Sequence, residues 1–343
     1  MCDQCHDGHN SAEHFFDILD SIDVGRKLGL ITRAEDPNTN AWIMARERDL
    51  RRELEPVTEE IGQESLDKIS KVIDDTDWAT ISVQAASIPI AIMAQTIDSS
   101  SIALATKAGP VVGNHGAKVY EDSRKLFVPD VSFDLVDKEA IAFAESNAPR
   151  WIRHHYGPAL SDKISKQTIN ALEKGLGREA LANSLKVTLE SEYLNYGAYW
   201  DTLSSAELVR NRSFSSIKTM SDQGIERFTS VSIGDERRCE RCGSLDGTIF
   251  SVPVAMTRMT NTIKNASTMQ HFQDSYPWIG QRGSAEKGNL EFYTKSYAGV
   301  ETDLTSAIGS MSIGSPDDGA TIQNLGALVP WHGRCRCLLI SVD

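Results

Sequence analysis

The chain ends in VPWHGRCRCLLISVD (residues 329–343), which brings His332, Cys335 and Cys337 close together in the sequence. A second cluster, DERRCERCGSLDG (residues 235–247), contains Cys239 and Cys242 in a C-x2-C arrangement. Zinc favours four thiolate or imidazole ligands in a tetrahedron, and two residues between cysteines let both sulfurs reach one ion. We therefore expect a C-terminal strand that a metal ion clips to an upstream cysteine knuckle.

The two clusters offer five candidate ligands for four positions. We expect Cys239, Cys242, His332 and one of the last two cysteines to bind, with Cys335 preferred to Cys337. Residues two apart in a strand point to the same face, so a wholly thiolate site with His332 as a neighbour stays open. A disulfide and unligated thiols are the alternatives. Four protein ligands leave no position for an activated water, so we expect a structural zinc.

Composition favours a globular, soluble protein, with 40% hydrophobic and 24% charged residues. A net charge of −13 argues against a general nucleic-acid binder, which needs a basic face to displace counterions from phosphates. A local basic strip could still contact DNA, although its spacing equally fits a helical salt-bridge face. The strip comprises Arg210, Arg212, Lys218, Arg227, Arg237, Arg238 and Arg241, diluted by Glu207, Glu226, Asp235, Glu236 and Glu240.

The N-terminus is acidic and has no continuous apolar core, so we expect no signal peptide and an intracellular, reducing setting. The most apolar stretch, residues 79–97, is too short and polar to span a bilayer and predicts a buried helix or helix pair. CDQCHDGH holds Cys2, Cys5, His6 and His9 in a pattern that includes C-x-x-C-H. Haem attachment needs export, so we favour a frayed terminus, with a small second metal site as the alternative.

The first third of the chain is predicted to be helical. Residues 41–75 carry Leu66, Ile69 and Ile73 at helical spacing, and Pro56 is expected to kink or divide this helix. Glycines and prolines between Gly109 and Pro129 predict a looped connection. We place a domain boundary there, which gives a helical N-terminal domain, 1–130, and a second domain, 131–343.

The second domain begins with more helices. Residues 161–177 have an apolar stripe of Ile164, Ile169 and Leu172, and residues 178–195 repeat leucines at Leu181, Leu185 and Leu189, so they predict a helical hairpin. A third helix is expected over 198–221. The adjacent His154 and His155 point in different directions on any regular element, so we expect a surface role for them and not a metal pair.

After the third helix, apolar residues no longer recur at helical spacing. β-Branched and aromatic residues favour a strand at 225–233, and the final CLLISVD predicts a second strand that pairs with it. Between them, about 260–328 is a long Ser-, Thr-, Asn- and Gly-rich insertion that we expect to be ordered with little regular structure. The fold class is therefore α+β, with helical N-terminal and middle regions and a small β-rich, zinc-clipped C-terminal module.

The pattern D-E-R-x-C-x-x-C-x-x-L-D-G, a variable gap and P-x-H-x-x-C-R-C resembles the phage Mu F-like minor head protein family. The resemblance spans about residues 137–343, departing from the family in Gly333, where proline is frequent, and in the length of the insertion. The residues that carry it are Asp235, Cys239, Cys242, Leu245, Asp246, Gly247, Pro330, His332, Cys335, Arg336 and Cys337.

The resemblance implies a minor head protein of a tailed phage or prophage, non-enzymatic, located in the virion head or neck and in the host cytoplasm during assembly. Its partners would be the portal protein and the major capsid protein, with no membrane. No P-loop, G-x-S-x-G, G-x-G-x-x-G or H-E-x-x-H motif occurs in the sequence. The alternatives are a DNA-binding accessory factor for packaging or ejection, and an enzyme or toxin such as a nuclease or transferase.

Overall fold

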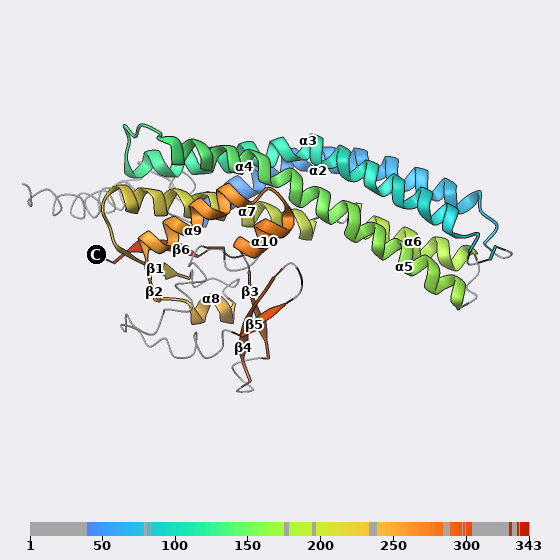
Figure 1. The fold of residues 1–343 in the computed structure, drawn as a ribbon. Helices are drawn as coiled ribbons and strands as arrows, with labels where there is room; N and C mark the ends of the chain where they lie inside the picture. Colours follow the sequence, from blue (N-terminus) through green and yellow to red (C-terminus); the bar gives the residue numbers. More distant parts are fainter. Residues whose placement is uncertain are drawn as a thin grey trace, which may run out of the picture. The chain divides into compact units, whose positions relative to one another are not determined.

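The computed structural model is an α+β fold of helices and two small antiparallel sheets, which confirms the predicted fold class (Figure 1). It divides into two compact units, each described by itself: unit 1 contains Met1–Arg48, His115–Ala144 and Thr202–Asp343, and unit 2 contains Asp49–Asn114 and Glu145–Asp201. The structure describes residues 40–78, 81–82, 84–174, 178–193, 197–232, 239–276, 278–283, 289–296, 298, 300–303, 329–330, 335 and 337–342.

Seven helical elements make up the first two thirds of the described chain. They are α2 (Asn40–Asp74), α3 (Ser87–Phe127), α4 (Leu135–His154), the π-helical turn η1 (His155–Ala159), α5 (Leu160–Glu173), α6 (Arg178–Tyr193) and α7 (Gly197–Asp222). α2 continues through Pro56, so this proline does not divide the helix, and the predicted kink stays a prediction. Leu66, Ile69 and Ile73 are buried, as their spacing predicted.

Unit 2 contains the predicted helical hairpin, formed by α5 and α6. Its core includes the leucine stripe of α6 (Leu181, Leu185 and Leu189), which is at most 1% exposed. Ile164 of α5 is also buried, but Ile169 is 39% exposed, which contradicts its predicted place in the stripe. Thr168 takes the inward position instead, because its hydroxyl donates to the Ile164 carbonyl at 2.9 Å and so needs no water.

The predicted loop from Gly109 to Pro129 is wrong, because α3 runs unbroken to Phe127. In unit 2 its glycines allow close helix packing: a Cβ on Gly109 would lie 2.5 Å from Cγ of Pro149, and one on Gly113 would lie 2.7 Å from Cα of Glu145. Residues four apart share one side of a helix, so α3 presents a bare backbone to α4 at this point. The division at residue 130 stays a prediction.

α3 is also the helix that explains the apolar stretch near residue 90. Among the described residues it alone is long and apolar enough to cross a membrane by length and composition. A single helix of this kind is weak evidence, since core helices pass the same test. The expectation of no membrane segment stays a prediction.

Unit 1 contains both sheets. The first has the order β2-β1-β6, with β1 (Arg227–Val231) antiparallel to both β2 (Ile249–Ser251) and β6 (Leu338–Ser341). Phe228 pairs with Phe250 on one side and with Ser341 on the other. The predicted pairing of the C-terminal strand with the strand after Ile225 is confirmed.

The insertion is more regular than expected in its described part. It holds the end of α9 (Val252–Asn265), α10 (Met269–Ser275) and a second sheet of β3 (Ile279–Arg282), β4 (Glu291–Lys295) and β5 (Glu301–Asp303). The polar residues that suggested irregular structure include helix caps: the Thr268 hydroxyl accepts from the His271 amide at 3.1 Å. Residues 304–328 lie outside the described residues.

Candidate metal centre

The upstream half of the centre is a short knuckle after β1. Cys239 is the N-cap of α8 (Glu240–Ser244), and its Sγ accepts from the Cys242 amide at 3.5 Å. The Gly243 amide donates to the Cys239 carbonyl at 2.9 Å. A C-x2-C segment in this conformation turns both sulfurs the same way, which is the geometry that one metal ion needs.

Three residues after the knuckle complete the turn back to β2. Leu245 is fully buried, the Asp246 carboxylate accepts from the Ser232 amide at 2.8 Å, and Gly247 has a φ of +76°. The Gly247 amide then donates to the Ser230 carbonyl at 2.9 Å. A left-handed φ favours glycine, so L-D-G in the family pattern has a structural role that the sequence alone did not assign.

The downstream half arrives directly before β6. Cys335 and Cys337 are 1% and 2% exposed, and both side chains face the knuckle. The sulfurs of Cys242, Cys335 and Cys337 all lie within 4.8 Å of one another. These three buried thiols lie close enough to hold a metal ion, and we call them the cysteine cluster.

The cluster's spacing suits a tetrahedral thiolate site. Cys242 Sγ lies 3.9 Å from Cys335 Sγ. Metal–sulfur bonds of 2.3 Å at tetrahedral angles place two sulfurs about 3.8 Å apart. All four described cysteines are free thiols, so this arrangement is not one of disulfides.

The pKa of the Cys242 thiol indicates that the cluster needs a compensating cation before its thiols lose their protons. Hydrogen bonds with Cys239, Cys335 and Cys337, together with burial, raise the pKa of Cys242 well above its usual range. Cys239 therefore adjoins Cys242, although its sulfur is not among the three that all lie within 4.8 Å of one another. Crowded, buried thiols lose their protons when a cation compensates the thiolate charge, which is how metal binding displaces protons from cysteine sites.

Residues of α7 and of the segment just after α10 hydrogen-bond to the backbone near the cluster. Arg212 of α7 donates from Nη2 to the Cys337 carbonyl at 3.3 Å. Tyr276, just after α10, donates its hydroxyl to the Val329 carbonyl at 2.6 Å, which ties down the chain upstream of the two final cysteines. Burial raises the pKa of Tyr276, so its hydroxyl stays a donor.

Several predicted residues cannot be placed in the centre. His332, Arg336 and the N-terminal Cys2, Cys5, His6 and His9 lie outside the described residues. The preference for His332 as a ligand therefore stays a prediction. The described sulfurs include both final cysteines, whereas the preferred set used one of them.

Three of the seven cations of the predicted basic strip are internal, whereas Arg227 is exposed and Arg241 is half-buried. Arg210, Arg212 and Lys218 are at most 4% exposed, and Arg237 and Arg238 lie outside the described residues. Glu207 and Arg210 do form the predicted helical ion pair, at 2.7 Å, but in the interior and not on a solvated face. Buried guanidinium and ammonium groups cannot reach a DNA phosphate, so DNA contact through Arg210, Arg212 and Lys218 is not compatible with this fold.

The two adjacent histidines are separated as expected. His154 ends α4 and His155 begins η1, where its ring stacks on Tyr199 with centroids 3.9 Å apart. His155 Nε2 lies 3.3 Å from Glu192 Oε2, with the histidine side chain 34% exposed. This arrangement is a helix-joining contact within unit 2.

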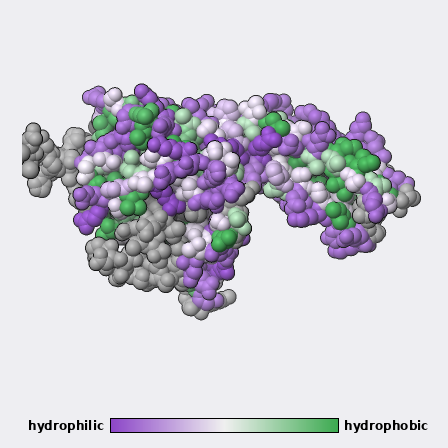
Figure 2. All heavy atoms as spheres, in the orientation of Figure 1, coloured by the Kyte–Doolittle hydropathy of each residue, from purple (hydrophilic) through white to green (hydrophobic). Residues whose placement is uncertain are grey.

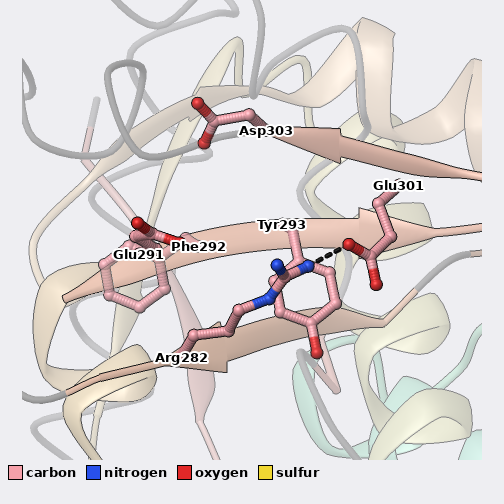
Figure 3. A pocket seen from close by; sticks show the side chains of 6 residues that line it. All are labelled: Arg282, Glu291, Phe292, Tyr293, Glu301 and Asp303. Atoms are coloured by element: carbon pink, nitrogen blue, oxygen red, sulfur yellow. Dashed lines mark hydrogen bonds and ion pairs between the residues drawn. The ribbon is translucent and has the colours of Figure 1, made fainter. Parts of the chain in front are cut away.

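A hollow of about 440 Å³ lies on the second sheet of unit 1 (Figure 3). Figure 3 shows the Arg282 guanidinium between the Tyr293 ring and the Glu301 carboxylate, with its carbon 4.4 Å from the ring centroid. The Arg282 guanidinium, the cationic group among the lining residues, is thus already paired with Glu301 and lies over the Tyr293 ring. The remaining polar lining consists of Glu291 and Asp303.

No protein-family model, curated protein or solved structure matches the chain.

Proposed function

We propose that this chain is a non-enzymatic minor head protein of a tailed phage or prophage, acting in head morphogenesis at the portal or inner capsid, with a structural zinc ion in its C-terminal module. The observation that carries the proposal is the meeting of Cys242 with Cys335, which are 93 residues apart in the sequence. This contact supports the resemblance because the two halves of the sequence pattern can bind one metal ion only if they meet in space.

Zinc is the metal that the donor set favours. Thiolates are soft ligands, and a tetrahedral all-sulfur set suits zinc better than magnesium, calcium or manganese. Cys239, Cys242, Cys335 and Cys337 would hold the ion. It would fix β6 to the knuckle and stabilise the module by restricting the unfolded chain.

An adaptor also needs apolar surface for its partners. Unit 2 exposes Ile88 and Ile92 of α3 and Val187 of α6, at 66%, 46% and 66%. Figure 2 shows hydrophobic surface over the part of unit 2 where α5 and α6 are labelled in Figure 1. Contiguous exposed apolar side chains are typical of interaction surfaces, and Ile88 and Ile92 are neighbours one turn apart on α3.

The test is co-expression with the portal and major capsid proteins of the same genome, followed by gradient sedimentation. We expect this chain in portal-containing particles at a low, fixed copy number. Ile88→Glu should lower its incorporation, whereas Val254→Glu, at an exposed apolar position in unit 1, is the matched control. A chain that stays at the top of the gradient would contradict the head-protein proposal, and assays for enzymatic activity and duplex-DNA binding would follow.

A further inference from the structure

In unit 1, α7 is buried around almost its whole surface from Leu203 to Met220, although 11 of these 18 residues are polar. From Leu203 to Met220 every residue except Ser216 is buried, including Glu207, Arg210, Arg212 and Lys218. Buried charges are costly unless they are paired or hydrogen-bonded. Each cation of α7 therefore needs an explanation.

The burial of Lys218 and Arg210 is compensated by contacts in the helical part of unit 1. Lys218 lies 2.5 Å from Asp222 and 2.9 Å from Asp134. Arg210 pairs with Glu207 at 2.7 Å, and its guanidinium lies over the Phe272 ring at 4.6 Å. Ion pairing and aromatic contact compensate the burial of both groups.

Arg212 reaches the backbone of one residue of the cysteine cluster. It is 4% exposed, and its Nη2 donates to the backbone carbonyl of Cys337, whose sulfur belongs to the cluster. Four thiolates around a divalent ion would leave a net charge of about −2 in the interior. A permanent cation beside that centre would offset part of this charge.

We propose that Arg212 is a positioning residue of the metal centre, which orients Cys337 through its backbone and compensates the charge of the thiolates. This inference rests on the proposed metal site. The bond acts at the residue directly before β6, so it fixes the approach of Cys337 and the start of the β1–β6 pairing at Val231 and Leu338 (Figure 1). Such outer partners orient ligands and tune the metal.

The experiment uses the full chain with zinc, in three variants. Arg212→Gln removes the charge and the planar donor fork, and Arg212→Lys keeps the charge alone. Arg46→Gln is the control: it removes an arginine of unit 1 that pairs with Asp122 and whose side chain is 30% exposed. Zinc affinity is measured by competition with a chromogenic chelator. We expect Arg212→Gln to raise Kd by about 10- to 100-fold, Arg212→Lys to recover part of the loss, and Arg46→Gln to leave Kd unchanged.

Cobalt substitution supplies a readout that general destabilisation would not move. The charge-transfer and d–d bands of Co²⁺ bound to the cysteines report their geometry, so we expect shifted bands in Arg212→Gln and wild-type bands in Arg46→Gln. Wild-type affinity and bands in Arg212→Gln would overturn the inference. Where Arg212→Gln does not fold, Arg212→Lys decides: weakening by more than about threefold supports the inference and a smaller change overturns it.

Cys242→Ser separates this inference from the proposed metal site. If wild-type protein and Cys242→Ser both bind no zinc, the metal site itself is wrong, and the inference falls with it. If wild type binds zinc and Cys242→Ser does not, an unaffected Arg212→Gln overturns the role of Arg212 alone.

Discussion

The Nε atom of Arg124 lies 3.0 Å from Oδ1 of Asp137, and the two side chains are only 1% and 0% exposed. The same carboxylate accepts from the Tyr120 hydroxyl at 2.7 Å. Arg124 also donates to Thr219 at 2.9 Å and to Asp222 at 2.6 Å. This one guanidinium therefore ties the end of α3 to the start of α4 and the end of α7, all within unit 1.

Removing the Asp137 carboxylate should strongly lower the free energy of unfolding. Asp137→Asn leaves the Arg124 charge in the interior with Asp222 as its remaining carboxylate, and breaking a buried pair costs about 3–5 kcal/mol. We expect a loss near the lower end, measured by urea denaturation. Asp122→Asn is the control, because the Arg46–Asp122 pair is about one-third exposed and should contribute less than about 1 kcal/mol. Equal losses in the two variants would contradict a special role for the buried cluster.

Gly113→Ala tests the close packing of α3 on α4 in unit 2. In an open helix this substitution stabilises by about 1 kcal/mol. Here the added Cβ would lie 2.7 Å from Cα and 2.8 Å from the carbonyl oxygen of Glu145, and backbone cannot move aside as a side chain does. We expect destabilisation of about 1–3 kcal/mol instead.

The neighbouring position is the matched control for that variant. Asn114 is exposed in the same helix, so Asn114→Ala should be neutral or slightly stabilising. Thermal unfolding followed by circular dichroism measures both. A higher melting temperature for Gly113→Ala would show that the two helices have room to separate.

These glycines also show why one part of the fold escaped prediction. The α5–α6 hairpin was predictable because its apolar periodicity is local, as in Leu181, Leu185 and Leu189. The β1 strand was predictable from its β-branched and aromatic content, and its pairing with β6 from the need of the two cysteine clusters to meet. Gly109 and Gly113 are typical of loops when considered alone. Their helical role depends on what faces them, and Glu145 and Pro149 come more than thirty residues later in the sequence.

The candidate metal site also has a part that could be predicted from the sequence and a part that could not. Cysteine spacing predicts which sulfurs can meet, because ligand geometry restricts the spacing. The support from Arg212 could not be predicted, since it lies 125 residues from Cys337 and has the spacing of a surface ion pair. Arg212 is one of three cations, with Arg210 and Lys218, in the same largely polar stretch of α7, so neither its type nor its spacing distinguishes it.

The ligand set can be decided by zinc content. In a four-thiolate site, Cys239→Ser, Cys242→Ser or Cys335→Ser should each remove most of the zinc, from about one ion per chain, and lower the melting temperature. His332→Ala should retain the ion. Elemental analysis of purified variants measures this directly.

Cys5→Ser is the control for a general effect of cysteine removal. It is not among the proposed ligands, so zinc content should not change. Loss of zinc in His332→Ala would restore the histidine to the ligand set, and loss in Cys5→Ser would indicate a second, N-terminal site.

Glu192 in unit 2 should make stability depend on pH in the acid range. Its carboxylate interacts with His155 at 3.3 Å and with Lys163 at 2.8 Å. The hydrogen bond with His155, assisted by Lys163, lowers the pKa of Glu192 from 4.5 to about 2. A carboxyl group with a lowered pKa stabilises the folded state above its ordinary pKa, and this contribution is lost as the pH falls from about 4.5 towards 2.

Glu192→Gln should therefore destabilise the protein by about 1 kcal/mol at pH 6, a modest value because water screens a partly exposed pair. The difference from wild type should shrink steadily below pH 4.5, because protonation then removes the same charge from the wild-type protein. Glu190→Gln, in the same helix, is the control: Glu190 makes a 3.6 Å surface pair with Lys186 and should have little effect at either pH. Denaturant unfolding at pH 6 and pH 3 measures the four differences. If Glu192→Gln costs the same at both values, the contact acts through packing and not through the carboxylate charge.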